Sequence, residues 1–241
     1  MTIAATTAPG ISEIFADAGA VGFLHAREIG VDGGPEVAIG ADEPVVLASV
    51  FKILVLTAFV RAVEAGELDG RERTTVTARY RIGGVGTAGF ADDTEVSWRD
   101  LALNMMSMSD NAATDVLYHR LGAAAVDRVI TDLGLHRTHL IGCCEDLFAS
   151  VVSGLGGTPD SDLDALLSGA SADQVLALDA LDPQRTTRST PREVTMLLDS
   201  LWSDRAAPAA ACRQARDIMA RQIWPHRLSS AFPSGVQIAA K

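Results

Sequence analysis

The apolar positions near the start of the chain predict one helix followed by two strands. Residues 11–20 have the spacing of a short helix, and residues 21–28 and 36–39 are rich in residues that favour strands. Residues 31–34 read Val-Asp-Gly-Gly, which is a turn signal between the two strands. We therefore predict a hairpin after the first helix.

The longest apolar stretch follows Ser49 and predicts a central helix. Residues 50–65 are almost entirely apolar, and Gly66 is typical of a helix end. A helix that is apolar on all sides is normally buried. Ser49 would then stand at a helix N-terminus, where unpaired N–H groups favour developing negative charge.

Further helices are predicted where a capping residue precedes an amphipathic segment. These segments are residues 97–106, 111–121, 123–133, 191–202 and 208–222. The stretch 136–157 has no clear period and is expected to be a long loop, while residues 71–93 are expected to be an extended excursion. Residues 235–241 have strand character.

Strands at both ends of the chain, with helices between them, predict an α/β (α+β) fold. In this arrangement both termini contribute to one antiparallel sheet, and a mainly helical part is inserted between them. The expected division is an α/β subdomain of residues 1–45 plus 205–241, and a helical subdomain of residues 46–204.

Composition narrows the possible partners of the chain. It has 241 residues, 48% of them hydrophobic, and a formal net charge of −11, which argues against nucleic-acid and anionic-membrane partners. No segment is long and apolar enough to suggest a membrane span. Residues 1–10 lack the pattern of a secretory signal, so the expected location is cytoplasmic as written, or extracytoplasmic if a leader was removed.

Cysteine usage predicts neither a disulfide framework nor a metal centre. Cys143 and Cys144 are adjacent, and Cys212 is the third cysteine. No histidine joins them at metal-ligand spacing in the sequence, so a zinc site has little support. The adjacent pair is interpreted as small, partly buried hydrophobic residues rather than reactive thiols.

The chain has only two lysines, and one of them follows Ser49 by three residues. Ser49 and Lys52 therefore lie one helical turn apart on the same face. A lysine in an apolar helix can have a lowered pKa and accept the proton of a serine nucleophile. Ser-x-x-Lys also recurs by chance, and lysine-poor composition could leave two lysines with no role.

Two further elements give the Ser-x-x-Lys motif a context. Ser109-Asp110-Asn111 lies at a helix junction, and Lys241 ends the last predicted strand. Taken in this order, the motifs resemble those of the class A β-lactamase and penicillin-binding-protein family of serine hydrolases. The alternative interpretation of Ser109-Asp110-Asn111 taken alone is an ordinary helix cap.

The resemblance implies a β-lactamase-like fold and a role for each matching residue. It implies that Ser49 is the acylated nucleophile and that Lys52 is its proton partner. Ser109 would relay a proton to the leaving nitrogen, and Asn111 would position the substrate and Lys52. Lys241 would contribute to substrate binding as the lysine of a Lys-Thr-Gly motif.

Two departures from the family pattern bear on activity. No Thr-Gly follows Lys241, and the C-terminal strands and helix of the family are missing, so we expect a truncated chain that is weakly active or inactive unless a companion chain supplies those strands. Glu145 is the candidate base for deacylation, with Asp146 weaker, but the expected Glu-x-x-Leu-Asn pattern is absent. Arg227 is a candidate for the substrate carboxylate or, equally, a solvated charge.

Three hypotheses remain open from the sequence. The first is a serine hydrolase that cleaves a β-lactam or a related amide or ester through an acyl-Ser49 intermediate, without a metal or cofactor. The second is an acylating penicillin-binding receptor or esterase that lacks efficient deacylation. The third is an inactive truncated remnant.

Overall fold

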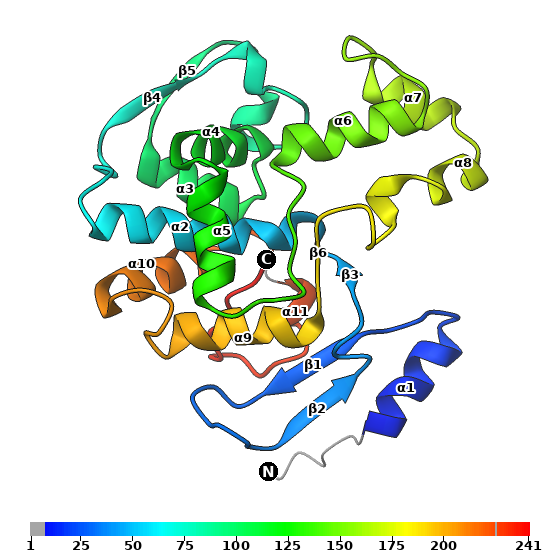
Figure 1. Ribbon diagram of the computed structural model, residues 1–241, viewed down its shortest axis with the longest axis vertical. Coiled ribbons are helices and arrows are strands. Elements are labelled where there is room, and N and C mark those ends of the chain that lie inside the picture. Colours follow the sequence, from blue (N-terminus) through cyan, green and yellow to red (C-terminus); the bar gives the residue numbers. More distant parts are fainter. Residues whose placement is uncertain (1–7, 225) are drawn as a thin grey trace.

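Helices dominate the fold, and the computed structural model describes residues 8–224 and 226–241 (Figure 1). The α-helices are α1 (Ala8–Asp17), α2 (Lys52–Glu64), α3 (Trp98–Ser107), α4 (Asn111–Leu121), α5 (Ala123–Asp132), α6 (Cys144–Gly154), α7 (Leu163–Gly169), α8 (Ala172–Leu176), α9 (Pro191–Trp202), α10 (Ala209–Met219) and α11 (His226–Ser229). Four short 3-10 helices are η1 (Ala48–Phe51), η2 (Ala78–Tyr80), η3 (Gly86–Gly89) and η4 (Asp179–Leu181).

The strands form three separate antiparallel pairs. They are β1 (Leu24–Arg27) with β2 (Glu36–Ile39), β3 (Val45–Val46) with β6 (Arg188–Ser189), and β4 (Arg73–Val76) with β5 (Thr94–Ser97). In the first pair Leu24 faces Ile39 and Arg27 faces Glu36. The predicted hairpin is therefore confirmed, and helices with small antiparallel sheets confirm the mixed α/β class.

Helix α2 is the centre of the core. Every residue from Lys52 to Val60 is buried, and Phe59 and Leu56 are 0% exposed. Helices α3, α4, α5 and α10 pack around α2, which crosses the middle of the molecule in Figure 1. Each large apolar side chain buried there contributes about 1.5–3 kcal/mol by removal from water. Burial of α2 therefore holds the helix in place, and with it Ser49, which lies just before its start.

Two predicted elements differ from the structure. Residues 136–157 were expected to be a loop, but α6 (Cys144–Gly154) forms within them, because its first N–H groups are capped by Asp115 and Asp146. Residues 235–241 were expected to be a strand, and they form none. No other described segment pairs with that backbone, and an extended segment becomes a strand only through such pairing.

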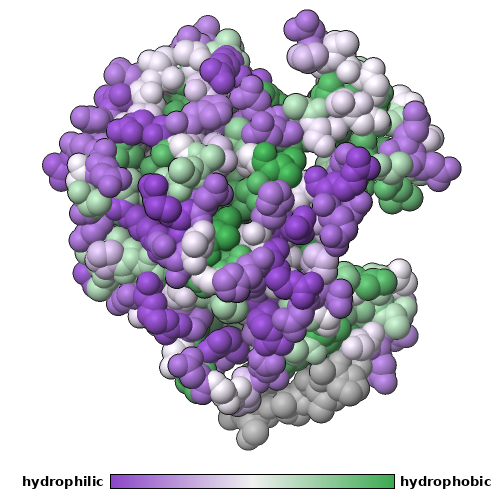
Figure 2. Space-filling model, viewed as in Figure 1, coloured by the Kyte–Doolittle hydropathy of each residue, from purple (hydrophilic) through white to green (hydrophobic). Residues whose placement is uncertain are grey.

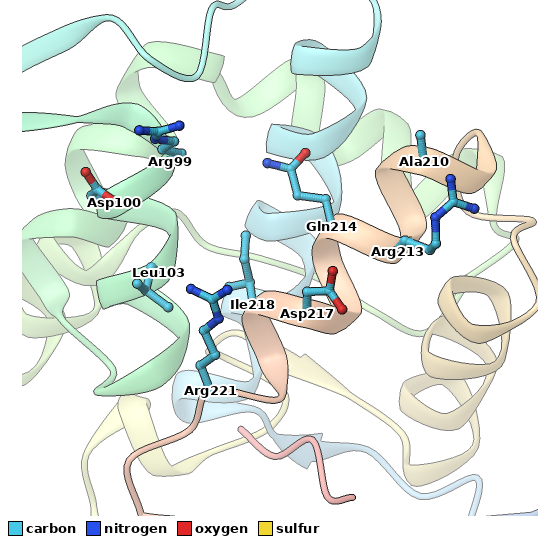
Figure 3. Close-up of a pocket in the computed structure, with 9 residues that line it drawn as sticks. All are labelled: Arg99, Asp100, Leu103, Ala210, Arg213, Gln214, Asp217, Ile218 and Arg221. Atoms are coloured by element: carbon cyan, nitrogen blue, oxygen red, sulfur yellow. The ribbon is translucent and has the colours of Figure 1, made fainter.

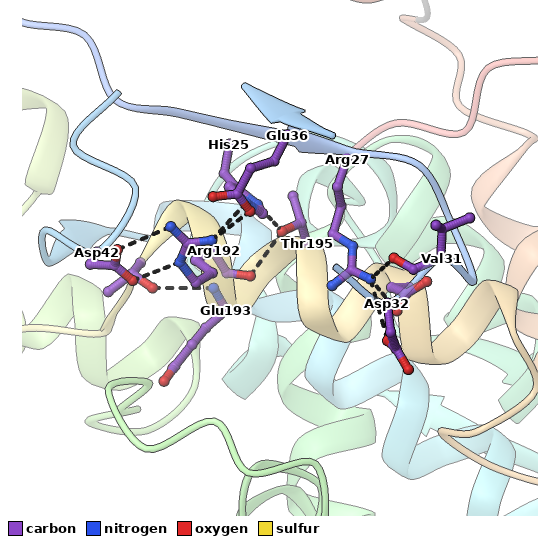
Figure 4. Close-up of polar contacts among 11 residues, drawn as sticks. His25, Arg27, Val31, Asp32, Glu36, Asp42, Arg192, Glu193 and Thr195 are labelled. Carbon is purple, nitrogen blue, oxygen red and sulfur yellow. Dashed lines mark hydrogen bonds and ion pairs between the residues drawn. The ribbon is translucent and has the colours of Figure 1, made fainter. Parts of the chain in front are cut away.

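A polar network fastens the hairpin to α9 (Figure 4). The Arg192 guanidinium donates to Glu36 Oε2 over 2.8 Å and grips Asp42 with two hydrogen bonds of 2.8 and 3.2 Å. Buried His25 contacts both Glu36 and Thr195, the latter also on α9. Because the planar guanidinium bonds two carboxylates at once, the network fixes the orientation of the hairpin relative to α9 as well as its position.

The surface is mostly polar on the face shown in Figure 2, which is hollowed at its right edge between the part carrying α6–α8 and the part carrying α1. Within the described residues, no helix combines the length and the apolar character needed to cross a membrane. The division into two subdomains stays a prediction.

Candidate active site

Ser49 lies at the entrance to the central helix. It is the second residue of η1, which leads directly into α2, and its side chain is half-buried. The preceding residue, Ala48, has a φ of 44°, a left-handed conformation that is strained for a residue with a Cβ. Within residues 8–224 and 226–241, the backbone N–H of Ser49 donates to no protein acceptor.

Lys52 is a completely buried cation with three acceptors. Its side chain is 0% exposed, and Nζ donates to Ser109 O over 2.8 Å, to Ser109 Oγ over 3.1 Å and to Asn111 Oδ1 over 2.8 Å. These bonds use all three protons of an ammonium group. Ser49 is not among the partners, so Lys52 reaches it only through a third group.

Ser109 is that third group. Its Oγ donates to Ser49 Oγ over 2.8 Å while it accepts from Lys52. Ser109 also has a left-handed backbone, with a φ of 64°. The conformation is held in place by Asp110, a fully buried N-cap of α4 that accepts from Ala113 N (3.0 Å), Thr87 N (2.6 Å) and Thr87 Oγ1 (2.8 Å).

Asn111 connects Lys52 to the surrounding loops. While its Oδ1 accepts from Lys52, its Nδ2 donates to Gly83 O over 3.2 Å. The thiol of Cys144 approaches the same Oδ1 at 3.6 Å. The side-chain amide therefore has its oxygen toward the lysine and its nitrogen toward the loop between η2 and η3.

Lys241 places a second ammonium group beside the first. Its Nζ donates to Met105 O, in α3, over 2.6 Å. Burial and the charge of Lys52 lower the pKa of Lys241 to about 7. Burial also lowers the pKa of Lys52, and the nearby Cys144 and Asp115 act in the opposite direction. Because burial and mutual repulsion disfavour two ammonium groups side by side, one of the two amines can be neutral near neutral pH.

Glu145 is close to the group but is engaged elsewhere. It lies in the first turn of α6, where Asp115 accepts from Cys144 N over 2.7 Å and from Glu145 N over 2.9 Å. The Glu145 carboxylate is 3.7 Å from Arg79 and 4.0 Å from His119. Among the described residues it has no hydrogen bond to the serines or lysines of the site.

The remaining predicted residues lie outside this group. Asp146 caps α6 by accepting from Cys143 N over 2.8 Å. The side chain of Arg227, in α11, lies outside the described residues. Burial raises the pKa of Cys144 to about 12, so this thiol is protonated at neutral pH. Cys143, Cys144 and Cys212 are free and buried.

Sequence reasoning missed the supporting residues Asp110, Asp115 and Thr87. Asp110 was visible as the middle residue of Ser109-Asp110-Asn111, and its position before a helix is a capping signal. Asp115 and Thr87 carry no local signal, because their partners are distant in the sequence.

A pocket of about 510 Å³ lies away from these residues, between α3 and α10 (Figure 3). It shares no lining residue with the group around Ser49. Its charged lining is Arg99, Asp100, Arg213, Asp217 and Arg221. The size of this pocket therefore says nothing about the chemistry of Ser49, which is defined by its hydrogen-bonded neighbours.

Solved structures with a similar fold include two β-lactamases and PBP-A. A β-lactamase from Sphaerobacter thermophilus has a TM-score of 0.72 and 24% identity, covering 97% of this chain and 75% of that chain. PBP-A has a TM-score of 0.65 and 22% identity, covering 90% and 67%. An ancestral class A β-lactamase has a TM-score of 0.63 and 20% identity, covering 84% and 67%. The β-lactamase-like fold is thereby confirmed.

The chain is similar to one named protein and to one family model, and the family model shows the family. The β-lactamase regulatory protein BlaB of Streptomyces cacaoi is 26% identical over 216 residues, which are 83% of this chain and 69% of that protein. Residues 7–241 match the sequence model of the beta-lactamase enzyme family. The chain therefore belongs to the beta-lactamase enzyme family.

Proposed function

We propose that the chain is a serine acyl-transfer protein of class A type, with Ser49 as the residue acylated by a β-lactam or a related amide or ester. The observation that carries the proposal is the chain of hydrogen bonds from Ser49 Oγ to Ser109 Oγ and on to Lys52 Nζ, over 2.8 and 3.1 Å. A serine becomes an effective nucleophile when a neighbouring base takes its proton.

In the acylation step, Ser49 Oγ forms a bond to the substrate carbonyl carbon. Its proton moves to Ser109 as the Ser109 proton moves to neutral Lys52. Hydroxyl hydrogens rotate, so the same path can then run in reverse. When the C–N bond breaks, Ser109 gives its proton to the leaving nitrogen and is reprotonated by Lys52. The backbone N–H of Ser49 would be one donor of the oxyanion hole, and such a donor stabilises the transition state by roughly 3–4 kcal/mol.

A second candidate is acylation without efficient turnover, as in a penicillin-binding receptor. The observation that favours it is the position of Glu145, whose carboxylate contacts Arg79 and His119 rather than the serines. The similarity to a protein named as a β-lactamase regulator is consistent with it. Deacylation requires a base that activates water beside the acyl group, so the lifetime of the adduct separates the two candidates.

The test is acylation of the intact chain by benzylpenicillin and by a chromogenic cephalosporin, followed by mass spectrometry. We expect one adduct, mapped to Ser49, and no adduct on Ser49→Ala. Ser153→Ala is the matched control, because Ser153 lies in α6, outside the hydrogen-bonded group. Colour development with a transient adduct supports hydrolysis, and a persistent adduct supports the receptor. Absence of any adduct from the folded wild type would contradict both.

A further inference from the structure

A thiol, an imidazole and a carboxylate converge beside the entrance to α6. Cys143 Sγ is 3.8 Å from His119 Nε2, and His119 Nε2 is 4.0 Å from Glu145 Oε2. The three ligand atoms all lie within 4.8 Å of one another. The sequence spacing gave no hint of this cluster, because His119 belongs to α4 and meets the cysteine only in the fold.

We propose that His119, Cys143 and Glu145 bind one Zn²⁺ ion, with a solvent molecule as the fourth ligand. Zinc prefers sulfur, nitrogen and oxygen donors in a tetrahedron, with bonds of about 2.3 Å to sulfur and about 2.1 Å to nitrogen or oxygen. Those lengths place ligand atoms roughly 3.4–3.6 Å apart. The sulfur–nitrogen and nitrogen–oxygen separations of 3.8 and 4.0 Å therefore need to close by a few tenths of an ångström. The sulfur–oxygen separation, which lies within 4.8 Å, needs to close by up to about 1 Å, and a rotation of the Glu145 side chain supplies this movement.

The backbone that carries these ligands is already fixed by other contacts. Asp146 accepts from Cys143 N, and Asp115 accepts from Glu145 N. His119 is held in the last turn of α4, with its ring 5.7 Å from the ring of Tyr80. Preorganised ligands lose little conformational entropy on binding, which favours affinity.

Access and charge both suit a cation. The side chains of His119 and Glu145 are 34% and 45% exposed, which leaves a solvent face for the fourth ligand. Asp115 and Asp146 add negative charge next to Cys143. The opposing cation is Arg79, 3.7 Å from Glu145 and 64% exposed, so it can turn into water when the ion binds. On binding, the Cys143 thiol releases its proton to solvent and coordinates as a thiolate.

The effect on turnover rests on the proposed function. Under the first candidate function, with Glu145 as the base that activates water, a zinc-bound carboxylate no longer accepts that proton, so zinc should prolong the lifetime of acyl-Ser49 in the wild type and not in Cys143→Ser. Under the second candidate function, the lifetime should not depend on zinc, and the metal titration alone tests the site. Metal binding itself is measured without any substrate. A failure of acylation is therefore distinguishable from a failure of the metal site.

The deciding experiment is titration of the chelator-treated full chain with Co²⁺ as a spectroscopic substitute for Zn²⁺. We expect a thiolate-to-cobalt charge-transfer band that saturates at one equivalent and is abolished by Zn²⁺. Cys143→Ser should remove the band, and His119→Gln should weaken Zn²⁺ binding by at least roughly tenfold, measured by calorimetry. Cys212→Ser, at a buried thiol in α10, should retain the band. No band in the wild type, or a band that survives in Cys143→Ser, would overturn the site.

Discussion

At the scale of single residues, the distinctive feature is a pair of lysines that share one buried region. Lys52 is fully buried, and burial together with the charge of Lys52 lowers the pKa of Lys241. Removing an ammonium group from water is costly unless it is paired, and here Lys52 donates to three neutral oxygens and Lys241 to one. Because burial disfavours the charged form of each amine, folding lowers the pKa of both lysines.

This pairing predicts a pH dependence of stability. The pKa of Lys241 is about 7 in the folded chain, below its usual value of 10.5. Between these pH values the unfolded chain binds more protons, so the free energy of unfolding should rise with pH. From about pH 7 to about pH 9, the wild type should gain roughly 1–2 kcal/mol more than Lys241→Met. Urea unfolding measures both, with Lys241→Arg as the permanently charged control. Parallel pH profiles for wild type and Lys241→Met would contradict the assignment.

Local spacing could predict some residues of the site and not others. Ser49 and Lys52 share a helical turn, so their proximity follows from the helix itself. The insertion of Ser109 between them does not, since it depends on the left-handed backbone at the junction of α3 and α4. The direction of the Glu145 side chain likewise depends on Arg79 and His119, which are far away in the sequence.

At the scale of elements, α6 shows how a distant residue can create a helix. Asp115, in α4, accepts hydrogen bonds from the first two N–H groups of α6, which would otherwise have no partner. Its partners are 29 and 30 residues away. A search for periodicity within 136–157 could not find this cap, whereas α9 was predicted because Thr190 and Glu193 carry its capping signal locally.

Removal of Asp115 should therefore loosen α6 selectively. Asp115→Ala leaves two buried N–H groups without an acceptor, which should cost about 2–4 kcal/mol of stability. Hydrogen exchange should show faster exchange at the start of α6 than in α2. Asp127→Ala, on the exposed side of α5, is the matched control and should change little. Equal effects of the two substitutions would show that α6 does not depend on this cap.

At the scale of the whole molecule, the hairpin is held to the helical body through α9. The Arg192 fork joins Asp42 and Glu36 across about 150 residues of sequence separation. The hairpin itself could be predicted from its turn and alternating pattern. The absence of a strand at 235–241 could not, because strand formation depends on a pairing partner. The expectation of a companion chain receives no support from the similar proteins.

Arg192→Met should release the hairpin without unfolding the helices. Amide protons of β1 and β2 should exchange roughly tenfold faster, while those of α2 keep their protection. Arg185→Met provides the control, since Arg185 makes an exposed ion pair with Asp179 away from the hairpin. If α2 and the hairpin lost protection together, the two parts would be one cooperative unit.

The left-handed backbone at Ala48 and Ser109 also affects how this protein can evolve. Each position carries a Cβ where glycine would be relaxed; Ala48 precedes Ser49, the proposed nucleophile, and Ser109 is the proposed proton relay. Replacing either residue by glycine should therefore increase stability by relieving backbone strain. Under the proposed mechanism, the same replacements would disturb proton transfer. Selection for thermostability, without selection for acylation, would therefore favour substitutions that remove the proposed activity.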